Sequence, residues 1–192
     1  MILLKPDTVE NWAYINVFTP EECDKIIEFG KQKTLKNARV GGSSENREGV
    51  ENIEYRKSNI AWITGEDFPD LYERLIPVVN NANSNYFNFD LFGFTENLQF
   101  TEYTSPGDTY KYHIDKVYNS TVRKLSMVVQ LTDESTYEGG DLELLLGETP
   151  DKLPKTRGTV LFFPSYVLHR VTPMVTGTRY SLVTWLGGPP FK

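Results

Sequence analysis

The sequence predicts a mainly β fold of the α+β kind, built on a double-sheet jelly roll with a cupin-like, double-stranded β-helix core. Three observations lead to this prediction. From about residue 87 onward the apolar residues fall into short strand-like segments, and two helical stretches precede most of them. Glycines such as Gly139-Gly140 and Gly158 supply turns between the segments. We therefore expect the N-terminal helices to pack on one sheet of the core.

The first helix has a clear start signal. Residues 13–18 read as a short strand, and Thr19-Pro20-Glu21-Glu22 follows with a capping Thr, a Pro suited to the first helical turn and a Glu three residues after the cap. Apolar or small residues then recur on one helical face. They are Cys23, Ile26, Ile27 and Gly30. We interpret this helix as packing against a sheet.

A polar segment over residues 40–54 separates this helix from the next elements. It is rich in Gly, Ser and Glu and poor in apolar anchors, so it is either a surface loop or a lid. A strand is expected over 55–63. A second helix is expected from about Phe68 to Ala82, with Pro77 marking a kink or a restart.

The remainder of the chain predicts strands and turns. The expected strands or strand segments are 87–91, 97–104, the segment that contains His113, 123–131, 141–146, 158–163, 167–174 and 179–186. Because no Pro/Ser-rich linker divides the chain, we expect residues 1–192 to form a single domain.

Composition restricts the classes of partner. The net charge is -6 and no basic run is present, which argues against a nucleic-acid-binding surface. The apolar run at the N-terminus is too short for a signal peptide or a membrane span. A single cysteine, Cys23, rules out an internal disulfide and favours a reducing compartment. We expect a cytoplasmic protein, and the oligomeric state is left open.

The two histidines of the chain predict a metal site. His113 and Asp115 are two residues apart at the expected end of a strand, so their side chains point to the same face. His169, from a distant strand, would complete a 2-His-1-carboxylate set, which binds non-haem Fe(II) and leaves other coordination positions open. Taken alone, the short motif also fits a rim histidine beside a chance Asp.

An arginine follows the second histidine at a distance that a hairpin would bridge. Pro173 and Gly177 lie between His169 and Arg179, so the two residues are expected on neighbouring antiparallel strands. If the register pairs odd-numbered with odd-numbered positions, their side chains share the interior face. These residues are His169, Val171, Arg179, Ser181, Val183 and Trp185. A buried guanidinium needs an anion, which is either a protein carboxylate or a carboxylate of a ligand.

With these motifs in order, the chain resembles the Fe(II)/2-oxoglutarate-dependent dioxygenases of the prolyl 4-hydroxylase type. The resemblance covers roughly residues 97–187, about half of the chain. It rests on Tyr103…Gly107…Tyr110…His113-Ile114-Asp115, Arg123-Lys124-Leu125-Ser126, Tyr137-Glu138-Gly139-Gly140-Asp141-Leu142, Phe162-Phe163-Pro164-Ser165, His169-Arg170-Val171-Thr172-Pro173 and Gly177-Thr178-Arg179-Tyr180-Ser181.

The resemblance implies a role for individual residues. It implies that His113, Asp115 and His169 bind Fe(II), and that Arg179 binds the distal carboxylate of 2-oxoglutarate with help from Tyr103 and Ser181. It also places Leu142 and Trp185 in the wall of the cosubstrate pocket. Gln130 lies near a position where some relatives have a tyrosine, which is a departure from the pattern.

The function that the resemblance implies is hydroxylation of an unactivated C–H bond. Its cofactors would be Fe(II), 2-oxoglutarate as cosubstrate, O2, and ascorbate as reductant. Peptidyl proline is the expected substrate, and the alternative is another amino-acid side chain or a free amino acid. A nucleic-acid dealkylase and an inactive jelly-roll binding module are the remaining readings.

Overall fold

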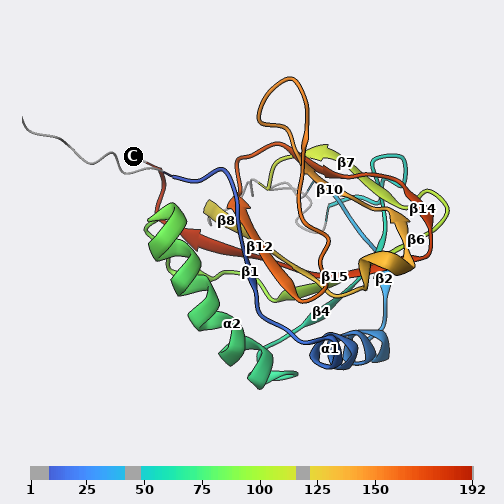
Figure 1. Cartoon of the computed structure of the whole chain (residues 1–192), viewed down its shortest axis with the longest axis horizontal. Helices are drawn as coiled ribbons and strands as arrows, with labels where there is room; N and C mark the ends of the chain where they lie inside the picture. Colours follow the sequence, from blue (N-terminus) through green and yellow to red (C-terminus); the bar gives the residue numbers. More distant parts are fainter. Residues whose placement is uncertain (1–8, 42–48, 116–121, 192) are drawn as a thin grey trace, which may run out of the picture.

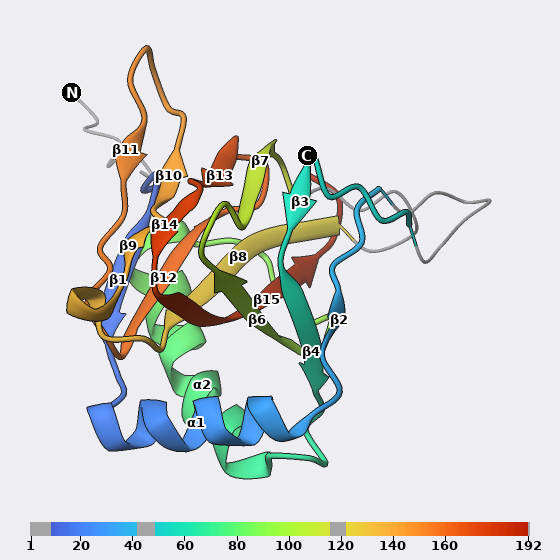
Figure 2. The ribbon, with the colours of Figure 1, turned by 90° about the vertical axis from the view of Figure 1, so that its right-hand side faces the viewer.

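Two antiparallel sheets face each other, and both helices lie against the outer face of the larger one (Figures 1 and 2). The computed structural model describes residues 9–41, 49–115 and 122–191. The predicted jelly-roll fold is confirmed. In the described part of the chain, no helix has the length and apolar character needed to cross a membrane.

The larger sheet contains the longest strands. In spatial order it comprises β1 (Ala13–Asn16), β12 (Thr159–Pro164), β8 (Val122–Gln130), β15 (Thr178–Gly188), β6 (Leu98–Thr104), β4 (Asn59–Ile63) and β2 (Lys36–Asn37), with β5 (Gly93–Phe94) paired to β15. Apolar residues on one side of these strands pack against the helices, and those on the other side face the second sheet. This sheet therefore separates two hydrophobic cores.

The smaller sheet covers the inner face of the larger one. Its order is β11 (Asp151–Lys152), β10 (Leu142–Leu144), β13 (His169–Val171), β7 (Thr109–His113) and β3 (Arg56–Lys57). A separate two-stranded ribbon consists of β14 (Met174–Thr176) and β9 (Glu138–Gly139), and short helical turns occur at Asn83–Phe87 and Glu134–Thr136.

Helix α1 (Pro20–Gln32) begins as predicted. The side chain of Thr19 accepts from the backbone N–H of Glu22, and the Glu22 carboxylate accepts from the N–H of Thr19. Cys23, Ile26 and Gly30 are buried on the face toward the sheet. Gly30 is needed there, because a Cβ at this position would lie 2.5 Å from the ring of Phe100.

Helix α2 (Pro69–Ala82) is one continuous helix, so the restart predicted at Pro77 is wrong. The loss of one backbone hydrogen bond is offset by a buried stripe that continues on both sides of the proline. This stripe consists of Leu71, Leu75, Val79 and Ala82.

The strand predicted over 55–63 is two strands in different sheets. β3 pairs with β7 in the smaller sheet, whereas β4 pairs with β6 in the larger sheet. Ser58 lies between them, where the chain crosses from one sheet to the other. This crossing carries Arg56 to the inner face of the jelly roll. Within the segment 40–54, predicted to be a surface loop or a lid, residues 42–48 lie outside the described residues.

Candidate metal and cosubstrate site

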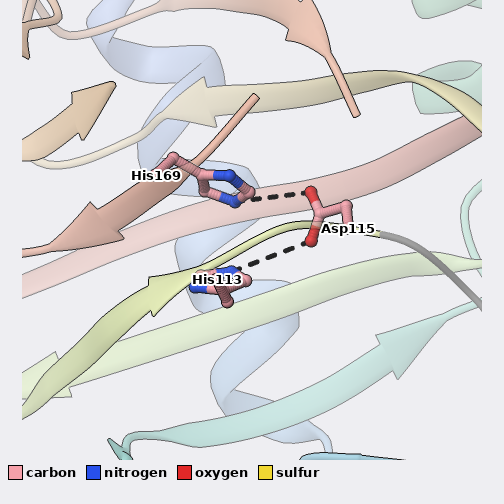
Figure 3. Close-up of side chains that lie close together, drawn as sticks. All are labelled: His113, Asp115 and His169. Atoms are coloured by element: carbon pink, nitrogen blue, oxygen red, sulfur yellow. Dashed lines mark ion pairs between the residues drawn. The ribbon is translucent and has the colours of Figure 1, made fainter. Parts of the chain in front are cut away.

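Three side chains from the smaller sheet and its margin converge on one point (Figure 3). His113 ends β7, and the β7–β13 register places it directly opposite His169. Asp115 lies beside the two rings, with Oδ1 3.7 Å from Nε2 of His113 and Oδ2 3.5 Å from Nε2 of His169. All the ligand atoms of the three side chains lie within 4.8 Å of one another.

Backbone contacts orient both imidazoles in the same way. Nδ1 of His113 lies 2.8 Å from the carbonyl oxygen of Lys111, and Nδ1 of His169 lies 2.8 Å from that of Val167. If these are N–H···O bonds, the Nε2 lone pairs face the centre of the cluster. Such an arrangement presets both rings as metal ligands.

The larger sheet holds the carboxylate. Ser126 on β8 donates a 2.6 Å hydrogen bond from Oγ to Oδ2 of Asp115, and the backbone N–H of Asp115 donates to the carbonyl of Ser165. Ser126 also shares a 2.9 Å hydrogen bond with Oγ of Ser165. Asp115 is thus fixed by side-chain and main-chain contacts at the base of the site.

The charge states of these groups suit a cation. Burial, reinforced by the nearby His169, lowers the pKa of His113 to about 3, so its imidazole is neutral and free to bind a metal. Burial alone would raise the pKa of Asp115, but attraction to His169 and His113 and the Ser126 hydrogen bond lower it. Two imidazoles and one carboxylate form the donor set that suits Fe(II), so the residues present fit the predicted metal.

Arg179 on β15 lies fully buried, with 1% of its surface exposed. Its Nη2 donates to Oε1 of Gln130 at 2.8 Å, while Nε has no hydrogen-bond partner among the described residues. Tyr103 is its cross-strand neighbour on β6, with the ring centroid 5.6 Å from the guanidinium carbon. In the described chain no ion pair involves Arg179. Because a guanidinium keeps its proton, this buried cation fits a ligand carboxylate.

Arg179 and the metal cluster open onto the same cavity, which has a volume of about 1710 Å³. Ser181, Leu142 and Trp185 also line it, and Nε1 of Trp185 is a second buried donor for which the described part of the chain offers no partner. Unsatisfied donors in a cavity wall are satisfied when a polar ligand binds. The structure thus brings together all the residues predicted for the metal and the cosubstrate.

The predicted hairpin between His169 and Arg179 is wrong. β13 pairs with β10 and β7 in the smaller sheet, whereas β15 pairs with β8, β6 and β5 in the larger one. The ribbon strand β14 lies between them in sequence and turns the chain from one sheet to the other. His169 and Arg179 share a cavity because their sheets face each other.

Sequence reasoning missed two contributors to the cavity and its surroundings. Ser126 holds the metal-site carboxylate, and its signal is a lone hydroxyl in the apolar run 125–129 of a central strand. Arg56 lines the cavity with Gln99 and is only 8% exposed. In the sequence it is one basic residue within a predicted strand. A strand position alone did not reveal that Arg56 faces inward.

Comparison with known proteins agrees with this geometry. The sequence pattern of the 2OG-Fe(II) oxygenase superfamily matches residues 98–187, which contain all three cluster residues and Arg179. Residues 98–187 belong to the 2OG-Fe(II) oxygenase superfamily. The membership predicted from the motifs is therefore confirmed.

Curated proteins are similar to a part of this chain. A PKHD-type hydroxylase of Synechococcus sp. (strain CC9605) is 38% identical over 85 residues, covering 43% of this chain and 38% of the relative. A PKHD-type hydroxylase of Alteromonas mediterranea is 36% identical over 89 residues, covering 43% of this chain and 39% of the relative. The matched region therefore spans about two fifths of the length of these relatives.

Solved oxygenase structures share the fold over almost the whole chain. A prolyl-4-hydroxylase of Pseudomonas putida superimposes with a TM-score of 0.71 at 20% identity, covering 94% of each chain. A prolyl hydroxylase of Trichoplax adhaerens, solved with a peptide fragment of the hypoxia inducible factor oxygen degradation domain, gives a TM-score of 0.73 at 21% identity. That match covers 92% of this chain and 83% of the Trichoplax chain.

Proposed function

We propose that residues 1–192 form one Fe(II)- and 2-oxoglutarate-dependent oxygenase domain that hydroxylates an unactivated C–H bond. The observation that carries the proposal is the shared cavity, in which the His113, Asp115 and His169 cluster lies with a buried Arg179 that forms no ion pair with any described residue. A cation site beside a buried cationic side chain suits a ligand that chelates a metal at one end and carries a carboxylate at the other.

Each residue has a distinct part in this proposal. His113, Asp115 and His169 would hold Fe(II), and Ser126 fixes the carboxylate of Asp115. Arg179 would bind the distal carboxylate of 2-oxoglutarate. Bound Fe(II), 2-oxoglutarate and O2 together supply an oxidant that hydroxylates a C–H bond, with release of succinate and CO2.

Further side chains shape the cosubstrate end of the cavity. Tyr103 and Ser181 are polar groups close to Arg179 in the strand register, and both are buried. We propose that they donate to the same carboxylate without adding charge. Leu142 and Trp185 would exclude water from this end, since both are buried in the cavity wall.

Peptidyl proline is the substrate that we propose first. In support, the solved structures with the same fold include prolyl hydroxylases, one of them bound to a peptide, and the curated relatives are named PKHD-type hydroxylases. The alternative is another amino-acid side chain or a free amino acid. A cytoplasmic location stays a prediction from the single Cys23.

Two measurements test the proposed reaction. Anaerobic addition of 2-oxoglutarate to the Fe(II)-loaded protein should produce a metal-to-ligand charge-transfer absorption band. Succinate release in air, with ascorbate as reductant, should then rise with a proline-rich peptide, and mass spectrometry should find one added oxygen atom in the peptide. The absence of the charge-transfer band would contradict the cosubstrate assignment and favour an inactive binding module. Stimulation by free amino acids alone would replace the peptide substrate by the alternative.

A further inference from the structure

The cavity contains a second buried arginine that the proposed reaction does not use. Arg56 on β3 is 8% exposed and lines the same cavity as the metal cluster. Its guanidinium carbon lies 4.5 Å from the ring centroid of Tyr110, and the Tyr110 ring in turn stacks on His113 with 3.4 Å between centroids. Arg56 is therefore one aromatic ring away from a metal-site histidine.

Only neutral side chains hold this guanidinium. Nε donates to Oγ of Ser58 at 3.1 Å, and Nη2 donates to Oε1 of Gln99 at 2.8 Å. None of the ion pairs found among the described residues involves Arg56, whereas its neighbour Lys57 pairs with Asp108. A buried cation without a carboxylate is costly, because the protein has removed water and supplied no counter-charge.

Two other sets of charges in the cavity are balanced. Arg123 pairs with Glu96 in the cavity wall. Once the site is loaded as proposed, the charges of Fe(II), Asp115, Arg179 and doubly ionised 2-oxoglutarate cancel. The positive charge of Arg56 is then left without a partner on the substrate side of the cavity.

We infer that the substrate presents a carboxylate to Arg56. Planar guanidinium groups bind carboxylates through two parallel hydrogen bonds, and the aromatic face of Tyr110 keeps the guanidinium plane fixed for such a contact. The carboxylate belongs to a free amino acid, to the C-terminal residue of a peptide, or to an acidic residue beside the hydroxylated one. This inference rests on the proposed function, because it assumes that the cavity holds the substrate next to the metal.

Matched acid and amide probes test the inference without turnover. The probes are L-proline and L-prolinamide, N-acetyl-L-proline and its amide, and the blocked dipeptides Pro-Asp and Pro-Asn, with the same pairs built on leucine and lysine. Calorimetry under anaerobic conditions would measure their binding to the protein loaded with Fe(II) and 2-oxoglutarate. We expect at least one acid to bind about 10-fold or more tightly than its amide. The acid and amide pair that shows this difference in affinity identifies the source of the carboxylate.

Two variants assign the preference to Arg56. Arg56→Gln removes the charge, and Gln99→Glu instead supplies an internal carboxylate that pairs with Arg56 and occupies it. Both variants should reduce the affinity for the acid probe about 10- to 100-fold, to the affinity measured for its amide. Lys57→Gln, which removes a charge from the exposed side of the same strand, should leave acid binding unchanged. Melting temperature and the charge-transfer band show whether each variant is folded and loaded.

The outcomes separate the inference from the proposed function. A missing charge-transfer band in the parent protein would count against the proposed function. A normal band with equal affinity for acids and amides, or with no acid bound at millimolar concentration, would overturn the inference alone. Loss of acid and amide binding to the same extent in Arg56→Gln would also overturn it, because Arg56 would then act only on cavity shape.

Discussion

Arg179 donates a 2.8 Å hydrogen bond from Nη2 to Oε1 of Gln130, so a neutral amide occupies the position from which a carboxylate would neutralise the cation. Gln130 is itself 1% exposed, and its Nε2 donates to the carbonyl of Pro154. The amide therefore orients Arg179 and leaves its charge available to a ligand. This relationship gives the first prediction.

Gln130→Glu should weaken 2-oxoglutarate binding. The new carboxylate would pair with Arg179 inside the protein and compete with the cosubstrate, raising its Kd by about 10- to 100-fold. Titration of the charge-transfer band measures this Kd. Gln130→Met, which keeps the volume and adds no charge, is the control and should have the smaller effect. Equal effects of the two variants would show that Arg179 does not bind the cosubstrate through its charge.

Arg179→Ala should weaken 2-oxoglutarate binding while metal binding is retained. The metal cluster belongs to the smaller sheet and its margin, and Arg179 belongs to the larger one, so truncation leaves His113, Asp115 and His169 in place. We expect the Kd of 2-oxoglutarate to rise by about 100-fold or more. Unchanged affinity for 2-oxoglutarate would contradict the assignment of Arg179.

Asp115→Ala should abolish metal binding and turnover and leave the fold intact. In the parent protein, a divalent metal at about 100 times its Kd should stabilise the folded state by about 2.7 kcal/mol. Differential scanning fluorimetry with and without Fe(II), or with Mn(II) in air, should show this increase in melting temperature for the parent protein and none for the variant. An equal increase in both would place the metal elsewhere.

Ser126→Ala should lower metal affinity without removing a ligand. The variant loses the 2.6 Å hydrogen bond to Asp115, so the carboxylate is less well fixed and its pKa rises. The metal Kd should increase by about 10- to 100-fold. Ser165→Ala is a useful comparison, because its hydroxyl contacts Ser126 and its effect should be weaker. Metal affinity equal to that of the parent protein would show that Ser126 has only a packing role.

Gly30→Ala tests the packing of α1 on the larger sheet. The added methyl group would overlap the ring of Phe100, and we expect a loss of about 1–3 kcal/mol in the free energy of unfolding. Gly65→Ala is the control, because its nearest neighbour would be the Tyr72 ring at 4.0 Å. Urea denaturation of both variants measures the difference. Equal stability of the two would show that α1 shifts to accommodate the methyl group.

The features of the fold and of the site that depend on neighbouring residues could be predicted from the sequence. The capping residues Thr19 and Glu22 indicated the start of α1, and the two-residue spacing of His113 and Asp115 indicated a shared face. Both features depend on neighbours in the chain. Patterns over a few neighbouring residues are enough to indicate them.

The parts that the sequence did not predict depend on how distant strands are arranged. Arg179 follows His169 by ten positions, with a Pro and a Gly between them, and this spacing fits a hairpin as well as a crossing between two sheets. The same limit applies to Arg56, because only the crossing at Ser58 decides which sheet carries its side chain. A strand pattern gives the alternation of faces and leaves the choice of partner strand to tertiary packing.

The division of the cavity between two sheets has a consequence for ligand length. The proposed metal ligands come from β7, β13 and the turn after β7, whereas Arg179 comes from β15, a strand paired along both edges in the larger sheet. A dicarboxylate that reaches both ends must have a length that matches the distance between the two sheets. We therefore expect a homologue one carbon shorter than 2-oxoglutarate to chelate the metal or to reach the guanidinium, and not both. The separation of the sheets, set by the apolar residues packed between them, thereby becomes a selector of chain length.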